Sequence, residues 1–470
     1  MNRVKLILIF LFAVNLPAIA LIRNVPSQYS TIQSAINASS HHDTILVQPG
    51  TYFENINFRG KNIVLTSRYY VNNDYSFIHT TIINGSTPQF PDTGSCVIIS
   101  GNEDSTAVLQ GFSITGGTGT KWMDEHGAGL YREGGGVLIQ YARPVIQHNI
   151  IHGNQTPSGG VSSTGGGGIR IGDSYPRFYN NVVTNNTGRY GAGIVLNYTG
   201  GEYRNNIVYK NYGSLEFGAG SGLWINGSFS RPVLVENNTI VFNTALSGTA
   251  GVYSLGAPAT LRNNIVWGNT AGSSVQISGS GLTVRYCNVQ GGFSGAGNIN
   301  VEPMFDSSNY YLRSSSPCID KGDSSIVYND PQDPGNPGQA KWPSRGTLRN
   351  DMGAYGGPFS SVIANTTVGV NSNQQALNPE SIILFQNYPN PFNPKTIIGY
   401  TLSDLNDRSI FVSLKIYDAL GKQSAVLVNE HKSPGSYEAE FDGSGFPSGV
   451  YLYVLKAGNF SETKRMMLLK

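Results

Sequence analysis

The densest group of side chains capable of chemistry lies between Gly116 and Gly134. Carboxyl groups in this stretch could serve as a general acid, a general base or ligands of calcium. An arginine or histidine beside them could handle a proton next to a sugar acid. The candidate catalytic residues are therefore Asp124, Glu125, His126 and Arg132.

Aromatic and charged residues in this and later stretches offer a second kind of chemistry, which is binding. The candidates for glycan contact are Trp122, Arg189, Tyr190 and Glu216. The flat faces of Trp122 and Tyr190 suit sugar rings, and the charges would set specificity. Three interpretations stay open: a polysaccharide lyase or glycoside hydrolase acting on acidic glycans, a protein that binds extracellular polysaccharide or acts as an adhesive rod, and a solvated loop without a ligand. We favour binding.

A repeat in the middle of the chain must position these residues. An asparagine recurs as the second residue of a four-residue phrase, at intervals of 32, 25, 32, 26 and 24 residues. Self-similarity at this period predicts stacked coils. Because coils stack about 4.8 Å apart, the amides can hydrogen-bond along the stack. The predicted structural ladder consists of Asn149, Asn181, Asn206, Asn238, Asn264 and Asn288.

A second asparagine set (Asn154, Asn186, Asn211, Asn243 and Asn269) is interpreted in the same way, and His148 lies in an asparagine column. Ligand binding by these columns is the alternative interpretation. The connections between the repeats differ in length, and the segment from Gly116 to Gly134 is the longest of them. Equivalent loops project from one face of a stack, and function is concentrated on such loops. We therefore expect the candidate residues to line one groove.

Acidic residues near the end of the repeat region suggest a weaker site. Asp320 and Asp323, with Asp330 and Asp333 further on, could hold calcium, which is the only cofactor that the sequence suggests. Aspartate beside proline and glycine is also ordinary turn chemistry, so we favour a cap built from turns. Cys287 and Cys318 could form a disulfide and leave Cys96 free, or all three thiols could be buried and unpaired.

Composition limits the partners and the compartment. The 470 residues include 58 glycines, only 13% are charged, and the formal net charge is +2, which makes nucleic acid a poor partner. Residues 1–20 are typical of a signal peptide, with Arg3 and Lys5 before an apolar run and Ala18-Ile19-Ala20 as the cleavage site. We expect an exported mature chain without a membrane span, located outside the cell or on its surface after passage through the periplasm.

The start of the mature chain carries a family resemblance. The segment from Ser30 to Asn37 predicts a short capping helix, and Ile45-Leu46-Val47-Gln48-Pro49-Gly50-Thr51-Tyr52 follows. Together with the repeats, this pattern resembles right-handed parallel β-helix proteins of the pectin-lyase-like superfamily. The resemblance implies an all-β fold over residues 21–358, with about nine or ten coils in a rod of roughly 45–50 Å. The aspartate clusters and arginine motifs of the pectin-degrading enzymes of this superfamily are not recognisable.

The C-terminal part carries a second resemblance. After a linker over residues 359–379, alternating segments from 380 to 470 predict about five to seven short strands in a small Ig-like β-sandwich. The segment from Asn387 to Pro394, Gly449-Val450-Tyr451 and the basic end from Lys464 to Lys470 resemble the C-terminal sorting domain of the type IX secretion system. This resemblance implies passage across the outer membrane, with the secretion machinery as the partner of residues 380–470.

Overall fold

The computed structural model describes residues 20–364 and 382–469, apart from residues 125, 128, 214–216, 218, 228–231, 273–274, 307–308, 385–386, 388–389, 403–409, 420, 434 and 458–459. The chain divides into two compact units after Val368. The predicted signal peptide, up to residue 19, and most of the predicted linker lie outside the described residues. Among the described residues, no helix has the length and apolar character needed to cross a membrane.

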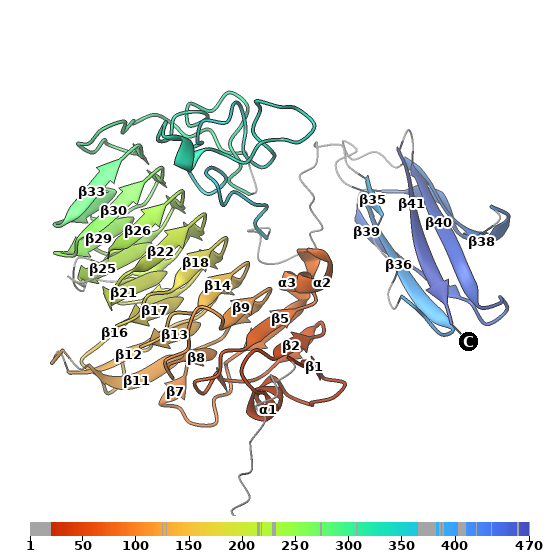
Figure 1. The fold of residues 1–470 in the computed structure, drawn as a ribbon, viewed down its shortest axis with the longest axis horizontal. Helices are drawn as coiled ribbons and strands as arrows, with labels where there is room; N and C mark the ends of the chain where they lie inside the picture. The colour runs from red at the N-terminus through yellow and green to blue at the C-terminus, as the bar shows by residue number, and fades with distance from the viewer. Residues whose placement is uncertain are drawn as a thin grey trace, which may run out of the picture. The chain divides into compact units, whose positions relative to one another are not determined.

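The first unit is a stack of coils in which each full turn of the chain contributes one strand to each of three parallel sheets (Figure 1). Sheet A contains ten strands: β1 (Ile22–Val25), β2 (Thr44–Val47), β5 (Val64–Ser67), β9 (Val108–Gln110), β14 (Val145–Gln147), β18 (Arg177–Tyr179), β22 (Gly201–Arg204), β26 (Val233–Glu236), β30 (Ala259–Arg262) and β33 (Leu282–Arg285).

Sheet B contains nine strands: β3 (Gly50–Tyr52), β6 (Thr81–Asn84), β10 (Ser113–Thr115), β15 (Ile150–His152), β19 (Val182–Thr184), β23 (Ile207–Tyr209), β27 (Thr239–Val241), β31 (Ile265–Trp267) and β34 (Asn288–Val289). Sheet C contains eight: β4 (Ile56–Asn57), β8 (Val97–Ile99), β13 (Val137–Gln140), β17 (Ile169–Gly172), β21 (Ile194–Thr199), β25 (Leu223–Gly227), β29 (Val252–Leu255) and β32 (Ile277–Gly279).

Two small sheets lie beside the coils. One contains β7 (Thr93–Gly94), β11 (Gly119–Asp124), β12 (Gly129–Glu133) and β16 (Ser163–Gly165), and the other contains β20 (Thr187–Gly188), β24 (Tyr212–Gly213) and β28 (Thr244–Ala245). Among the described residues the helices are α1 (Ile32–Ala38), α2 (Tyr69–Asn72), α3 (Ser76–Thr80) and the 3-10 helix η2 (Ile326–Tyr328). Helix α1 begins at a capping box formed by Thr31 and Ser34, and it buries Ile32, Ala35 and Ile36.

Inward side chains of the three sheets form one continuous core. In sheet A the strands are in register at one inward position, so Ile146, Phe178, Tyr203, Val235 and Leu261 stack in a column, and each is at most 2% exposed. Alternate residues of a strand point to opposite faces, so every second residue of a strand enters this core. The all-β, right-handed β-helix predicted from the repeats is confirmed.

Asparagine side chains bond successive coils at the corner between sheets A and B. The Nδ2 of Asn206 donates to the Oδ1 of Asn238 at 2.9 Å, and the same kind of bond joins Asn149 to Asn181, Asn181 to Asn206, and Asn238 to Asn264. The residue before each of them has a positive φ, 54° at Asn180 and 52° at His148. The left-handed bend therefore falls one residue earlier than the ladder itself. A second ladder runs from Asn154 to Asn269.

Asn288 differs from the prediction and is not a member of the first ladder. Asn288 is paired with Ile265 in sheet B, and the thiol of Cys287 receives the bond from the Asn264 backbone N–H at 3.4 Å. The Asn288 amide instead donates to the carbonyl of Val301 at 2.7 Å. The ladder thus ends on a thiol, one residue before the expected position, because the last coil enters sheet B one residue out of phase with the phrase.

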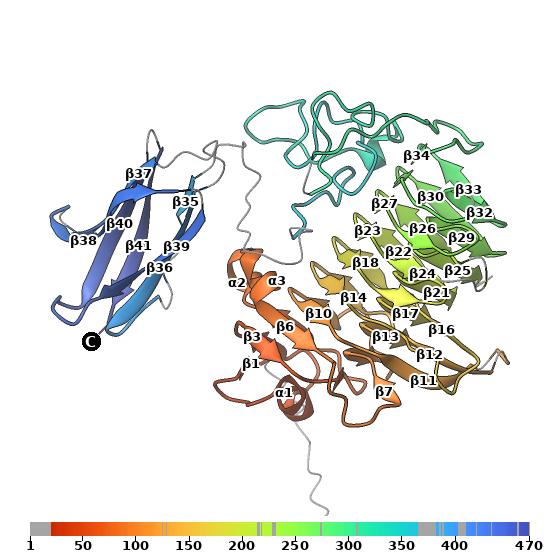
Figure 2. The same cartoon turned by 180° about the vertical axis from the view of Figure 1, so that it is seen from behind.

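Residues 290–364, which we call the closing segment, cover the outer face of sheet B (Figure 2). This face is apolar, with Ile150, Val182, Ile207 and Ile265 all buried. The closing segment packs against it with, among others, Tyr311, Leu312, Cys318, Met352, Ala354, Tyr355, Ile363 and Ala364. The result is a second core outside the coils. Cys96, Cys287 and Cys318 are all free thiols and all buried.

The second unit is a β-sandwich of two antiparallel sheets. One sheet contains β35 (Ile382–Leu384), β36 (Lys395–Leu402) and β39 (Gly435–Asp442), and the other contains β38 (Gln423–Lys432), β37 (Ile410–Asp418), β40 (Gly449–Ala457) and β41 (Phe460–Leu468). Ile398, Tyr400, Leu414, Tyr453 and Leu468 lie in its core. The predicted small sandwich is confirmed.

Candidate functional site

The segment from Gly116 to Gly134 is an antiparallel hairpin of β11 and β12, where the sequence suggested a loop. Trp122 pairs with Tyr131, and Lys121 pairs with Arg132. Because side chains alternate along each strand, Trp122, Asp124, Tyr131 and Glu133 lie on one face of the hairpin. Arg132 lies on the other face. Its guanidinium donates to the carbonyl of Pro91 at 2.9 Å and pairs with Asp92 at 3.2 Å.

The first face of the hairpin encloses a cavity against the outer surface of sheet C. We call this space, of about 140 Å³, the hairpin cavity. In register on the outer surface of sheet C lie Leu138, Arg170, Val195, Trp224 and Tyr253, and beside them Gln140, Gly172, Asn197, Asn226 and Leu255. The cavity is lined by Trp122, Asp124, His126, Tyr131, Glu133, Tyr190, Asn197, Tyr198, Phe217, Trp224, Asn226 and Leu255.

A buried carboxylate organises one wall of this cavity. Glu133 is 1% exposed, and its Oε2 accepts a hydrogen bond from the Trp122 indole N–H at 2.9 Å. The same oxygen pairs with the Nε of the fully buried Arg170 at 3.2 Å, and Oε1 accepts from the Tyr190 hydroxyl. The Arg170 guanidinium also stacks on the Trp122 ring, 4.0 Å from its centroid. Burial and the Glu133 charge raise the pKa of Tyr190, so its hydroxyl remains a donor.

Gly172 makes room for this arrangement. A Cβ at residue 172 would lie 2.2 Å from the Arg170 guanidinium, so no larger residue fits beneath the arginine without displacing it. The buried ion pair is therefore part of a fixed frame that holds the Trp122 and Tyr190 rings. Such a frame is what a preformed binding site needs, because ordering the rings in advance lowers the entropy lost on binding.

The tip of the hairpin is held by His126. Its Nε2 lies 3.1 Å from a carboxylate oxygen of Asp173, and its ring stacks on Tyr198 with centroids 3.5 Å apart and planes 18° from parallel. Asp173 is held in turn by the Gln140 amide at 3.0 Å. His126 is thus a positioning contact between the hairpin and the coils beneath it.

Some of the candidate residues predicted from the sequence line the hairpin cavity, and others do not. Trp122, Asp124, His126 and Tyr190 line the hairpin cavity, with Tyr190 only 4% exposed, so it contributes to the floor. Arg132 faces away from the cavity, and Arg189 is not among its lining residues. Glu125 and Glu216 lie outside the described residues.

The residues of the site that were not candidates from the sequence include Glu133, Arg170, Tyr198 and Trp224. Glu133 had a signal, since in a hairpin that pairs Trp122 with Tyr131 it lies opposite Thr120, on the same face as Trp122. Arg170 and Trp224 had a weaker one, as single large polar or aromatic residues between inward aliphatic neighbours of short strands.

The aspartates proposed for calcium are engaged separately. The Asp320 carboxylate accepts bonds from the Thr347 N–H at 3.0 Å and its hydroxyl at 2.7 Å, and Asp323 pairs with Arg262 at 3.6 Å. Among the residues that the structure describes, no group of three or more His, Cys, Asp or Glu side chains is arranged to hold a metal ion. Burial and the charge of Asp351 raise the pKa of Asp330, and burial and the charge of Asp320 raise the pKa of Asp351.

Comparisons with known proteins identify both units. Residues 386–469 match the secretion system C-terminal sorting domain, which marks the chain for export to the cell surface or beyond. Searches of curated proteins and of solved structures find no match. Residues 26–289, more than half of the chain, match the family described as right handed beta helix region. The chain therefore belongs to the right-handed β-helix family and carries a C-terminal sorting domain for secretion.

Proposed function

We propose that this exported β-helix protein binds extracellular polysaccharide through the hairpin cavity. The observation that carries the proposal is the set of aromatic side chains fixed around one small space by the buried Glu133–Arg170 pair. Trp122, Tyr131 and Tyr198 are half-buried and thus offer ring surface to a ligand, while Tyr190 and Trp224 form the floor beneath them. A sugar ring has an apolar face and a polar rim, which fit aromatic rings and nearby amides respectively.

The charges of the lining favour neutral sugars over acidic ones. Neither lysine nor arginine is among the described lining residues, whereas two carboxyl side chains, Asp124 and Glu133, are. Arg170 is fully buried behind Trp122. Its charge is neutralised by Glu133, so it is not available to pair with a uronate. The described lining therefore offers no lysine or arginine to pair with a uronate, and an unpaired carboxylate loses hydration free energy in a partly enclosed site.

The same geometry favours binding over catalysis. A general acid must reach the glycosidic oxygen, but Glu133 is 1% exposed and both of its oxygens are engaged. Asp124 is 7% exposed, and Arg132 points away from the cavity. The lyase or hydrolase activity on acidic glycans is therefore the second candidate, and the binding assay can include a readout for it.

The test is a binding panel with matched variants of the full chain. Immobilised cello-, xylo-, manno- and laminari-oligosaccharides serve as neutral probes, and oligogalacturonate serves as the acidic probe. We expect retention on at least one neutral probe and a loss of about tenfold or more in affinity for Trp122→Ala and for Tyr198→Ala, because truncating an aromatic anchor costs more than about 1 kcal/mol. Phe53→Ala is the control, since Phe53 is 60% exposed and is not among the cavity's lining residues.

Each outcome has a clear meaning. Equal affinity of wild type and both cavity variants would show that this cavity is not the site. Preference for oligogalacturonate would contradict the charge argument. Release of new reducing ends or of unsaturated uronate from any probe would replace binding with catalysis.

A further inference from the structure

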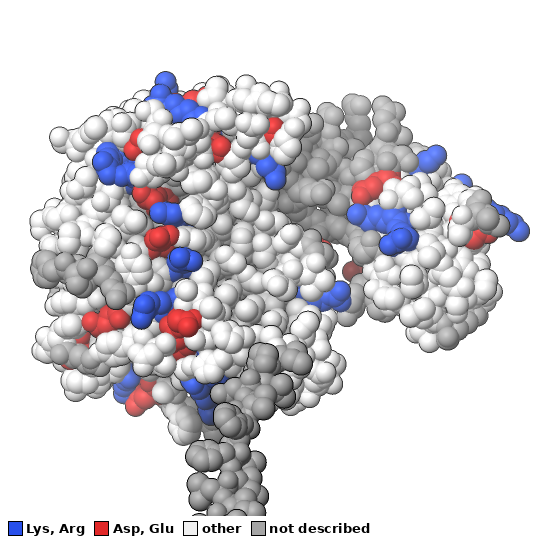
Figure 3. Space-filling view, in the orientation of Figure 1, with Lys and Arg blue, Asp and Glu red and all other residues white. Residues whose placement is uncertain are grey.

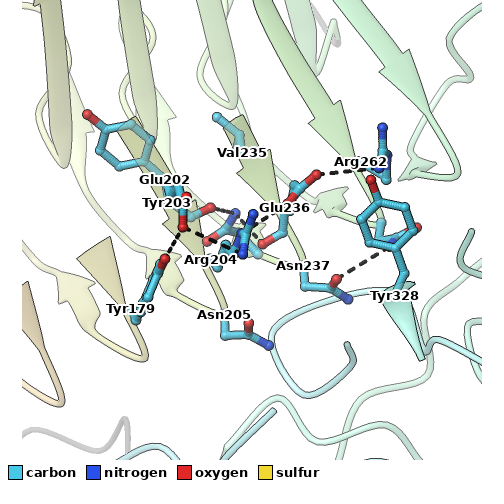
Figure 4. A network of polar contacts seen from close by, with 12 residues as sticks. Tyr179, Glu202, Tyr203, Arg204, Asn205, Val235, Glu236, Asn237, Arg262 and Tyr328 are labelled. Carbon is cyan, nitrogen blue, oxygen red and sulfur yellow. Dashed lines mark hydrogen bonds and ion pairs between the residues drawn. The ribbon is translucent and has the colours of Figure 1, made fainter. Parts of the chain in front are cut away.

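A second cavity lies on a different face of the β-helix, between the outer surface of sheet A and the closing segment. This space, which we call the closing-segment cavity, has a volume of about 250 Å³. Its floor is formed by Arg204 of β22 and Glu236 of β26, with Asn205 and Asn237 following these strands, and one wall includes Tyr328 (Figure 4). Phe359 is the second aromatic residue of the lining.

The two aromatic walls are held by cations on the sheet. The Arg204 guanidinium lies 4.9 Å from the Phe359 ring centroid, and the Arg262 guanidinium lies 4.2 Å from that of Tyr328. The floor asparagines hold the backbone between these walls. Asn205 donates to the carbonyl of Gly356 at 2.7 Å, and Asn237 donates to that of Asp351 at 2.8 Å. The cavity is thus built by the fold rather than left by loose packing.

The charges around this cavity alternate and cancel. Arg204 pairs with Glu236 at 3.0 Å and with Glu202 at 3.6 Å, and Arg262 lies 3.6 Å from both Glu236 and Asp323. On the face of the β-helix in view in Figure 3, positive and negative side chains alternate along a line across the strands. Because one arginine and one glutamate line the cavity, the lining has no net charge to attract an ion.

These features define a ligand class. A neutral ligand with an apolar face and several hydroxyl groups matches this lining. The aromatic walls can contact the apolar face, and the planar Arg204 guanidinium and Glu236 carboxylate can bond neighbouring hydroxyl groups. The volume is below the roughly 300 Å³ at which pockets for drug-sized ligands begin, so it has room for about one ring.

We propose that the closing-segment cavity is a second site for a neutral pyranose ring, so that one β-helix holds two glycan segments at once, on sheets A and C. This inference rests on the proposed function, which assigns the first glycan segment to the hairpin cavity. Two sites on different faces of one stack cannot both be filled by adjacent rings of one short oligosaccharide. The second site therefore implies that the protein bridges glycan chains, with binding strengthened by multivalency.

The experiment measures how many oligosaccharides one chain binds. Isothermal titration uses the full chain and the best neutral oligosaccharide of the panel. We expect two bound oligosaccharides per chain for the wild type, one per chain for Trp122→Ala and for Phe359→Ala, and none for the variant that carries both substitutions. Phe359→Leu, which keeps the apolar bulk and removes the aromatic face, should behave like Phe359→Ala. Phe359 is 40% exposed, so an unchanged urea midpoint is expected and is checked for each variant.

The outcomes separate the two proposals. One site per chain that is lost in Trp122→Ala and unchanged in Phe359→Ala and Phe359→Leu overturns the second site and leaves the proposed function standing. One site per chain that is lost in the Phe359 variants and unchanged in Trp122→Ala overturns the proposed function of the hairpin cavity and supports the second site. Turbidity of a long neutral polysaccharide mixed with wild type, and its absence with either single variant, would support bridging, whereas equal turbidity with all variants would overturn it.

Discussion

Replacing Glu133 by alanine should destabilise the β-helix far more than a typical surface change. The carboxylate is 1% exposed, and it neutralises the Arg170 side chain, which is itself 1% exposed. Removing one partner of a buried ion pair leaves an uncompensated charge and costs about 3–5 kcal/mol. The Trp122 N–H and the Tyr190 hydroxyl lose their acceptor in the same step.

The expected loss can be measured by urea unfolding. With an m value of about 3 kcal/mol/M, a destabilisation of 3 kcal/mol or more lowers the midpoint of the β-helix transition by about 1 M or more. Near-ultraviolet circular dichroism follows the aromatic cluster, and an unchanged m value would show that the unfolded state is not altered.

A double-mutant cycle separates the charge from the packing. Arg170→Met removes the charge and keeps an unbranched apolar chain beneath the Trp122 ring. Replacing a buried ion pair by apolar side chains is often neutral or stabilising, so Glu133→Ala combined with Arg170→Met should be more stable than Glu133→Ala alone, by at least about 2 kcal/mol. A midpoint shift below about 0.3 M for Glu133→Ala, or a double variant less stable than the single one, would refute the ion-pair reasoning.

Three further predictions concern the frame that carries the site. Asn206→Ala should cost more than about 3 kcal/mol, because several buried ladder groups lose their partner, whereas the exposed Thr283→Ala should shift the urea midpoint little. Burial lowers the pKa of His148 and of His152 to about 4, below the value of about 6.5 in the unfolded chain. The unfolded state therefore binds more protons, and stability should fall by up to about 3 kcal/mol per histidine as pH drops from 6.5 to 4. His148→Asn should reduce that acid sensitivity in urea midpoints at pH 7 and 4.5, and an unchanged slope would contradict it. Tyr355→Ala should cost about 3–5 kcal/mol by thermal or urea unfolding, since the ring is buried in the second core; a loss below about 1 kcal/mol would mean that the closing segment is held by other contacts.

The sequence predicted those features of the fold that recur in every coil. Asparagine at a fixed place in each coil predicts a ladder, because stacked coils bring identical side chains together, and the bonds between Asn149 and Asn264 follow that logic. The rule gave the wrong residue at Asn288, where no repeat follows to fix the register and a thiol fills the position. The fold class and the export of the chain were likewise predictable from motifs that recur among many proteins.

The site was less predictable because it depends on partners that meet only in space. Glu133 and Arg170 are 37 residues apart, and nothing local shows that they form a buried pair. Arg132 looked as suitable as Trp122 until the hairpin pairing placed them on opposite faces. The side-chain direction in a hairpin follows from its register, and both strands of this hairpin also pair with distant segments, at Gly94 and Ser163.

The closing segment changes how the stack can come apart. A plain array of coils contacts only its neighbours, so it can fray from either end, one repeat at a time. Here the closing segment, which follows the last coil, contacts the N-terminal part of the stack. The Ser361 hydroxyl lies 3.3 Å from that of Tyr75, which lies between β5 and β6, 286 residues earlier in sequence. Loss of the coils beneath the closing segment would also expose the apolar outer face of sheet B, which couples the unfolding of these coils to that of the closing segment. We therefore expect the stack to unfold more cooperatively than an open array, and to reach its full stability only once the closing segment, residues 290–364, is present.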